Sequence, residues 1–274
     1  MSRQVVPITG RTAVLGIIGE PLAQAATPGL MNQELALRGQ DAVLVPFGVG
    51  ASHLESALDG LREVTSFAGA VVTMPHKQTA MALLDHVTPR AREIGAVNVL
   101  KRLPHGKLAG DMLDGIGFIV GLGNLMPELR GRRVLIAGAG GAATALAFAC
   151  ARAEAVVGIM NRSSERAELL VERLAQAKLN GEVISAPTQG WDVVVNATNL
   201  GLKADDEIPV PEQTLLSRPV VSDIVISDYG DTSLIRAARK FGCPSQNGLP
   251  MLAGQIRLMA DFILSDDDHS GRFS

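Results

Sequence analysis

The segment RRVLIAGAGGAATALAFACARA (residues 132–153) contains a short apolar run, a glycine-rich turn and a helix-length run in direct succession. Gly138 permits a tight turn and Gly140 lets the backbone approach a pyrophosphate, while Ala143 takes the third position of the pattern, where helix packs on strand. A pyrophosphate would lie at the helix N-terminus, where unpaired N–H groups and the helix dipole favour anions. The segment therefore predicts the strand–turn–helix unit of a dinucleotide-binding fold. The alternative interpretation is a tight turn without a ligand.

Short apolar runs alternate with helix-length segments on both sides of this unit, which predicts parallel strands with helical crossovers and hence an α/β protein. After the unit, strands are expected at 155–161, 191–198 and 220–226, with helices at 163–178 and 232–242. Before it, strands are expected at 14–19, 42–47 and 67–73, with amphipathic helices at 27–39 and 52–64, each opened by a Thr or Ser. Residues 96–112 are expected to form a hairpin around Leu-Pro-His-Gly.

The two alternating series predict two domains. Residues 1–114 together with 248–274 are expected to form an N-terminal αβ domain, and residues 115–247 a Rossmann-type, doubly wound dinucleotide-binding domain. The last apolar helix, roughly 249–264, has no strand after it and must bury its apolar face elsewhere. We expect it to return to the first domain.

Composition limits the classes of function. Of the 274 residues, 47% are apolar and 19% charged, so a packed core is expected, and the net charge of −3 without a basic stripe argues against a nucleic-acid partner. The sequence contains no run of 18 apolar residues, so no membrane span is predicted. The start MSRQVVPITGR lacks the apolar run of a signal peptide. Cys150 and Cys243 are interpreted as reduced core thiols of a cytoplasmic protein. The five histidines show no ligand spacing, so no metal is predicted; residues 265–274 are expected to be a solvated tail.

The end of the second strand after the glycine turn bears on the choice of cofactor. NAD sites usually place an Asp or Glu there to bind the ribose hydroxyls, but this chain has Asn161, Arg162 and Ser163, with Arg166 one turn further on. Two guanidinium groups and a hydroxyl fit a 2′-phosphate, because arginine pairs with phosphate oxygens in a planar fork. We predict NADP, with NAD possible. The alternative is that Arg162 and Arg166 are an ordinary solvated pair.

Several motifs, in order along nearly the whole chain, resemble those of the shikimate dehydrogenase family. They are VVTMPHK (71–77), GAVNVL (95–100), GDMLDGIGF (110–118), GAGGAATA (138–145), NRSSERA (161–167), NATNLG (196–201) and NGLPMLAGQ (247–255). The resemblance implies an NADP-dependent oxidoreductase of aromatic amino acid biosynthesis, with a small-molecule substrate on the first domain and NADP on the second. A monomer or homodimer is expected.

The resemblance also implies roles for individual residues. Lys77 looks like the catalytic lysine of the family and Asp114 like its aspartate partner. Oxidising a secondary alcohol removes a hydride from carbon and a proton from oxygen, so a base within hydrogen-bond reach must take that proton. Substrate-binding roles are implied for Thr27, Thr73, Asn98 and Gln255. Cofactor-binding roles are implied for Gly138, Gly140, Gly141, Ala142, Asn161, Arg162, Ser163, Arg166, Asn196 and Thr198.

The chain departs from the family pattern near the expected substrate face. Where the family reads His-Ser-x-Ser-Pro, this chain has Gln24, Ala25, Ala26, Thr27 and Pro28. Other departures replace polar residues with less polar ones, at Val71, Met112, Leu113 and Ile226. We therefore expect a dehydrogenase that favours a compound related to shikimate or uses shikimate poorly. Two alternatives stay open: a quinate-type or NAD-preferring enzyme, which Thr27 could suit, and a non-catalytic dinucleotide-binding regulator, against which Lys77 and Asp114 argue.

Overall fold

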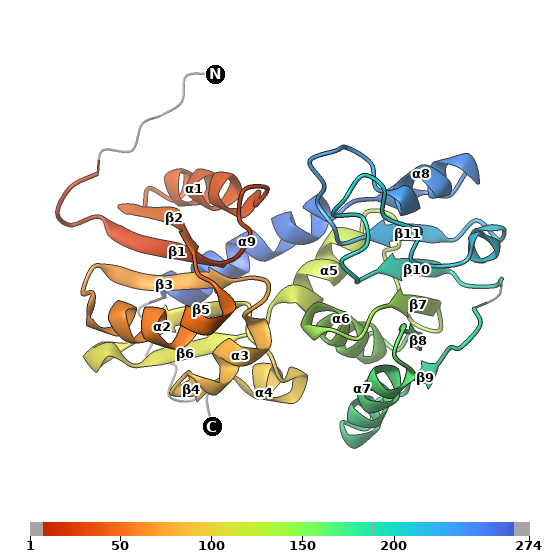
Figure 1. Ribbon diagram of the computed structural model, residues 1–274, viewed down its shortest axis with the longest axis horizontal. Coiled ribbons are helices and arrows are strands. Elements are labelled where there is room, and N and C mark those ends of the chain that lie inside the picture. Colours follow the sequence, from red (N-terminus) through yellow and green to blue (C-terminus); the bar gives the residue numbers. More distant parts are fainter. Residues whose placement is uncertain (1–7, 188, 266–274) are drawn as a thin grey trace. The chain divides into compact units, whose positions relative to one another are not determined.

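The structure is a computed structural model that describes residues 8–187 and 189–265 (Figure 1). It divides into two compact units, one made of residues 8–113 and 256–265 and the other of residues 114–255. Most of the expected tail, with His269, lies outside the described residues. The domain boundaries expected near residues 115 and 247 stay a prediction. Within the described ranges, no helix combines the length and the apolar character needed to cross a bilayer.

The first unit is built on a mixed six-stranded sheet with the strand order β2-β1-β3-β5-β6-β4. Its strands are β1 (Ala13–Gly19), β2 (Ala42–Gly48), β3 (Phe67–Val72), β4 (His86–Val87), β5 (Val99–Arg102) and β6 (Leu108–Asp111). Its helices are α1 (Thr27–Leu37), α2 (Leu54–Glu63), α3 (Lys77–Ala82) and α4 (Pro89–Ile94), with single turns η1 (Ala51–His53) and η2 (Pro104–Gly106). β1 pairs in parallel with β2 and β3, whereas β5 pairs antiparallel with β3 and β6. The predicted strands and the hairpin are confirmed.

The first helix begins at Thr27, as predicted, but neither of the first two helices is capped by a Thr or Ser side chain. The N-cap of α1 is Ala26, whose backbone is already helical, and no side chain caps this end. Pro28 lies in the first turn, where its fixed φ suits the helix and its missing N–H costs no hydrogen bond. In the second case η1 precedes α2, the N-cap is His53, and Ser56 donates its hydroxyl to the His53 carbonyl.

The second unit is a doubly wound sheet of six parallel strands with the order β12-β11-β10-β7-β8-β9. Its strands are β7 (Arg133–Ala137), β8 (Val156–Met160), β9 (Glu182–Val183), β10 (Val193–Asn196), β11 (Val220–Asp223) and β12 (Ser245–Gln246). Its helices are α5 (Asp114–Leu122), α6 (Gly141–Arg152), α7 (Ser164–Gln176) and α8 (Ser233–Lys240), with the turn η3 (Glu212–Leu215). The strand order reverses between β7 and β10, which is the ligand-binding point of such sheets. This confirms the predicted α/β class.

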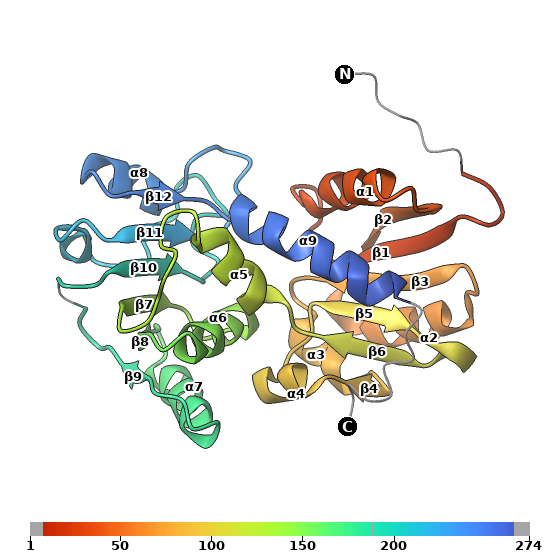
Figure 2. The ribbon, with the colours of Figure 1, turned by 180° about the vertical axis from the view of Figure 1, so that it is seen from behind.

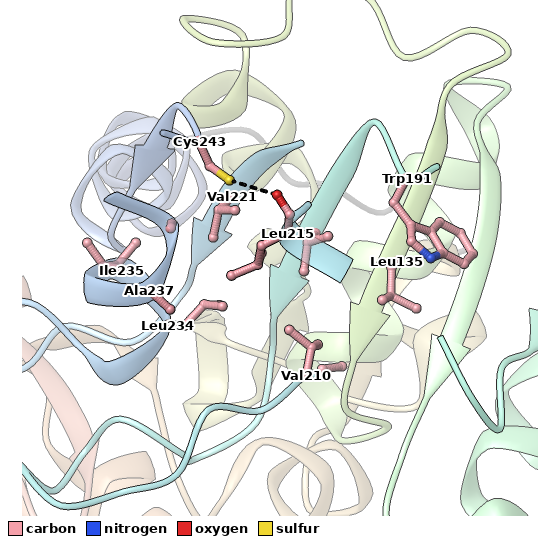
Figure 3. Packing of buried hydrophobic residues seen from close by; sticks show 12 residues of the cluster. Leu135, Trp191, Val210, Leu215, Val221, Leu234, Ile235, Ala237 and Cys243 are labelled. Atoms are coloured by element: carbon pink, nitrogen blue, oxygen red, sulfur yellow. Dashed lines mark hydrogen bonds between the residues drawn. The ribbon is translucent and has the colours of Figure 1, made fainter. Parts of the chain in front are cut away.

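The core of the second unit fills the space between the sheet and the elements that cover it (Figure 3). Leu135 and Trp191 lie at one end of the cluster and Ile235 at the other, and the Cys243 thiol donates to the Leu215 carbonyl at 3.6 Å. Cys150 is also free and buried, and burial raises the pKa of its thiol to about 12. Both cysteines are therefore core residues with unreactive thiols.

The last helix, α9 (Leu249–Leu264), contributes to both units, because the unit boundary falls after Gln255. Its second half belongs to the first unit, where Figure 2 shows it beside β3 and β5. A methyl group added at Gly69 of β3 would lie 3.0 Å from Ile263. Arg38 at the end of α1 donates to Asp261 at 2.5 Å and to the Arg257 carbonyl at 3.2 Å.

Candidate active site

One edge of the sheet in the first unit gathers the predicted substrate-binding segments. β1 and β3 run in parallel, so both end at this edge, while the antiparallel β5 begins there and β6 ends there. Val72 donates its N–H to the Asn98 carbonyl at 2.8 Å, and Asn98 donates its own N–H to Asp111 at 2.9 Å. The hairpin is therefore what brings residue 98 next to the end of β3.

Thr73 and Lys77 follow directly on β3. The N–H of Thr73 bonds to Ile18 at 2.9 Å, and the carbonyl of Thr73 accepts the N–H of His76 at 2.9 Å, which turns the chain into α3. Lys77 is the first residue of α3 and half-buried, and its carbonyl accepts the N–H of Val97 at 2.9 Å. The backbone of Lys77 is thus fixed to the segment that carries Asn98.

Asn98 is buried, and its side-chain oxygen accepts the N–H of Leu113 at 2.8 Å. Leu113 immediately precedes Asp114 in the chain. The backbone that leads into Asp114 is therefore oriented by Asn98. Asp114 itself opens α5 and is buried.

Sequence reasoning missed a second anchor of this segment. Asp111 is buried and accepts hydrogen bonds from the Thr88 hydroxyl, the Arg90 guanidinium and the N–H of Met112. Thr88 also caps α4, accepting the N–H of Ala91 at 3.2 Å. A signal was present, since Thr-Pro-Arg is a typical helix start and Asp111 lies in the quoted motif GDMLDGIGF.

Residues 24–26 of the segment that departs from the family pattern lie between β1 and α1, and Thr27 and Pro28 belong to the first turn of α1. Gly19 at the end of β1 is in direct contact with Thr73, because an added methyl would lie 2.4 Å from its Cγ2 atom. Ala25 and Ala26 are half-buried and Thr27 is buried at the first position of α1. The structure therefore places an apolar pair in the loop that leaves this edge of the sheet, and one threonine hydroxyl at the start of α1.

The glycine turn of the second unit lies between β7 and α6, as predicted. Gly138 has a φ of 124°, and a methyl group there would lie 2.6 Å from the Ala197 carbonyl oxygen, so only glycine fits. Gly140 is the N-cap of α6, and no side chain caps this helix. Gly141 and Ala142 form the first turn and are half-buried. Uncapped N–H groups at a helix start can bind an anion.

The end of β8 carries the predicted phosphate-binding residues. Ser163 is the N-cap of α7, accepting the N–H of Arg166 at 3.4 Å, and the Asn161 amide donates to the Ser163 carbonyl at 2.9 Å. Arg162 and Arg166 are exposed, and among the described residues neither side chain forms an ion pair or hydrogen bond. Both guanidinium groups are available for a phosphate.

The loop NATNLG (196–201) follows β10 beside the glycine turn. The amide oxygen of Asn196 accepts both the N–H and the hydroxyl of Thr198, at 3.0 and 2.7 Å, and its amide nitrogen donates to Leu200 and to Asp223. Asn196 is fully buried, whereas Thr198 is half-buried. The amide oxygen and the amide nitrogen of Asn196 are therefore both fully hydrogen-bonded within the protein.

Gln255 is buried on α9 and packs against α5, since a methyl group at Gly117 would lie 2.1 Å from its Cγ atom. Gln255 and Asp114 thus belong to two helices of the second unit that are in contact. In the described part of the chain, no three side chains of His, Cys, Asp or Glu form a group that could hold a metal ion.

Comparison with known proteins gives consistent matches. A model of the shikimate dehydrogenase substrate binding domain matches residues 17–100, and one of shikimate/quinate 5-dehydrogenase matches residues 123–203. A shikimate dehydrogenase (NADP(+)) of Rubrobacter xylanophilus is 40% identical over 256 residues, covering 90% of this chain and 89% of that protein.

Two solved structures are also similar over nearly the whole chain. Shikimate dehydrogenase from Aquifex aeolicus has a TM-score of 0.85 and 32% identity, with 94% of each chain covered. A 5-ketofructose reductase of Gluconobacter sp. strain CHM43 has a TM-score of 0.81 and 31% identity, covering 93% of this chain and 94% of that one.

Proposed function

Because this chain belongs to the shikimate dehydrogenase family, we propose that it is an NADP-linked dehydrogenase acting on a CH–OH group of a cyclic polyol carboxylate such as shikimate. The observation that carries the proposal is the 40% identity to a shikimate dehydrogenase (NADP(+)) over 90% of the chain. The substrate is a small molecule.

Lys77 and Asp114 supply the proton chemistry in this proposal. When bound, NADP⁺ supplies the acceptor for the hydride that leaves the carbinol carbon. Lys77 takes the proton of the hydroxyl group, and Asp114 orients the lysine by charge and hydrogen bonding. The fixed backbone around both residues supports these roles, because a base must be held within about 3 Å of the proton that it removes.

The second unit binds the cofactor. Gly140, Gly141 and Ala142 at the uncapped start of α6 would bind the pyrophosphate through their N–H groups, and Gly138 keeps the turn close to the strand. Arg162 and Arg166 would bind the 2′-phosphate, and this would favour NADP over NAD. Asn196 supports the loop that carries Thr198.

The substrate-binding residues are Thr27, Thr73, Asn98 and Gln255, and the segment 24–28 favours a compound other than shikimate. A hydrogen bond to a charged group contributes about 1.5–3 kcal/mol. One hydroxyl fewer toward a carboxylate should weaken its binding by roughly 10- to 100-fold. The buried Val71, Met112 and Leu113 make the same edge of the sheet less polar. A panel of cyclic hydroxy acids and neutral polyols tests this part.

The proposal extends to location and assembly. Two free, buried thiols support a reducing compartment such as the cytoplasm. We propose a monomer or homodimer, which light scattering on the purified protein distinguishes.

Reduced-nicotinamide absorbance tests the main proposal, with NADP⁺ or NAD⁺ and each candidate substrate. Lys77→Ala should abolish turnover and leave NADP⁺ affinity unchanged, while the exposed Lys107→Ala in the hairpin should retain both. Turnover that survives Lys77→Ala refutes the assigned role of Lys77. Wild-type protein that binds a dinucleotide but oxidises no compound of the panel would instead support the regulator alternative.

A further inference from the structure

A buried carboxylate lies behind the proposed cofactor loop. Asp223 is the last residue of β11, is fully buried, and is the register partner of Asn196 in the neighbouring β10. It accepts the Asn196 amide at 2.9 Å and the N–H of Val225 at 3.0 Å on one oxygen, and the Thr232 hydroxyl at 2.6 Å on the other. Sequence reasoning assigned no role to this residue.

The carboxylate determines which way the Asn196 side chain is turned. An ionised Asp223 only accepts hydrogen bonds, so the NH₂ group of Asn196 must face it. The amide oxygen of Asn196 then faces Thr198, where it accepts two hydrogen bonds. With the opposite orientation, an amide oxygen would face a carboxylate and an NH₂ group would face two donors. Asp223 therefore sets the orientation of the Asn196 amide, to which the loop after β10 is hydrogen-bonded.

The loop in turn touches the glycine turn. Ala197 donates its N–H to Ala137 at 2.8 Å, and its carbonyl lies against Gly138 so closely that no methyl group fits there. At the other end of the loop, a methyl group at Gly201 would lie 2.9 Å from Thr232, which itself caps α8 and bonds to Asp223. A continuous series of contacts thus runs from Asp223 through Asn196 and Ala197 to Gly138.

We propose that Asp223 is a positioning residue for dinucleotide binding, whose ionised carboxylate holds the loop 196–201 in the conformation that supports the Gly138 turn. This inference rests on the proposed function, because it takes the turn to be the pyrophosphate site. It assigns no contact between Asp223 and the cofactor.

The surroundings make the charge state of Asp223 relevant near neutral pH. Burial raises its pKa to about 6, against the lowering effect of its three hydrogen bonds. The ionisable side chains of the elements next to Asp223 interact with residues other than Asp223. On α8, Arg236 bonds to the Asp231 carbonyl, Arg239 pairs with the Asp231 carboxylate and Lys240 lies 3.8 Å from Glu212. Asp206, after the loop, accepts the N–H groups of Gly201 and Lys203. β10 and β12 contribute no ionisable side chain.

The test is the dissociation constant of NADP⁺ for Asp223→Asn, measured by calorimetry on the full chain from pH 5 to pH 7.5. The isosteric amide keeps an acceptor for Asn196 but loses the charge, so NADP⁺ should bind about fivefold more weakly at pH 7.5. The ratio of variant to wild type should fall toward one at pH 5, where Asp223 is itself protonated. Because the 2′-phosphate also titrates near pH 6, the ratio and not the absolute affinity is the readout.

Two further variants keep the test decisive. Asn196→Asp places two carboxylates in contact and should weaken binding more than Asp223→Asn does. Thr214→Val is the matched control, since it removes one buried hydrogen bond of the same unit, to Pro211, away from the loop. It should lower the melting temperature and leave NADP⁺ affinity unchanged.

Affinity of Asp223→Asn within twofold of wild type at pH 7.5, or a ratio independent of pH, overturns the inference. Asn196→Asp that weakens binding no more than Asp223→Asn does also overturns it. Wild-type protein that binds neither NADP⁺ nor NAD⁺ refutes the proposed function instead, so the two failures are distinguishable.

Discussion

The side-chain oxygen of Asn98 holds the N–H of Leu113 at 2.8 Å, one residue before Asp114. Asn98 was expected only as a substrate-binding residue. The bond shows a second task, because it fixes the backbone from which the proposed catalytic carboxylate projects.

Asn98→Leu should therefore lower kcat by about 10- to 100-fold, since a misdirected partner of the base costs that much in comparable sites. The Kd of NADP⁺ should not change. Thr12→Val is the control: Thr12 is equally buried at the opposite end of β1 and donates to Asp41 at 2.7 Å. If Asn98→Leu lowers only the melting temperature, as the control should, Asn98 has a structural role alone.

Arg162 and Arg166 should determine cofactor preference. Each alanine variant should raise KM for NADP⁺ about tenfold, and the pair about 100-fold, because each removes a charge-assisted bond to phosphate. KM for NAD⁺ should stay within twofold. Arg173→Ala, on the last turn of the same helix, is the control. An equal rise in KM for both cofactors would contradict the 2′-phosphate assignment. An unchanged KM for both would identify Arg162 and Arg166 as a solvated pair.

Ala25→Ser should raise kcat/KM for shikimate by about tenfold if this position faces the substrate carboxylate, because it adds one donor to a charged group. KM for NADP⁺ should be unaffected. Ala23→Ser, two residues earlier and exposed, serves as the comparison. A wild-type kcat/KM for shikimate of ordinary biosynthetic size, unaltered by Ala25→Ser, would argue against the altered-substrate hypothesis.

Asp223 also gives a stability prediction. Its pKa is raised from 3.8 to about 6 in the folded protein, so the folded state holds the proton more tightly than the unfolded state does. This group therefore lowers stability as pH rises from about 4 to above 6, by up to ~3 kcal/mol. Asp223→Asn lacks this dependence, so its melting temperature should improve relative to wild type over that interval. A constant difference between the two proteins from pH 4.5 to pH 7 would show that Asp223 does not titrate there.

Periodicity predicted the long elements well. β8 and α7 lie within two residues of their predicted ranges, and β7 and α6 lie inside the predicted strand–turn–helix unit, because apolar runs, helical runs and the glycine turn follow one another clearly. The short β4, β9 and β12, two residues each, were missed, since their pairing depends on neighbours far along the chain. α5 was also missed, because three glycines in nine residues lower its intrinsic helix propensity.

The site residues were predicted from motif resemblance, which did not identify residues whose role depends on tertiary contacts. Ser163 was expected to bind phosphate, and the structure shows that it also caps α7. Asp223 belongs to no local pattern that distinguishes it from a surface carboxylate, whereas Asp111 lies in the motif GDMLDGIGF but received no role of its own. Their importance comes from hydrogen bonds to residues that the fold alone brings together.

The glycines of α5 have a consequence for the order of folding. Methyl groups at Gly115, Gly117 and Gly121 would lie 2.1–2.6 Å from atoms of α6 and of the first turns of α9, so all three contacts require bare backbone. Such a segment is a weak helix by itself and gains stability only from partners that are already formed. We expect the amides of α5 to acquire protection from solvent exchange after those of β7 and α6, which pulse-labelling during refolding would measure.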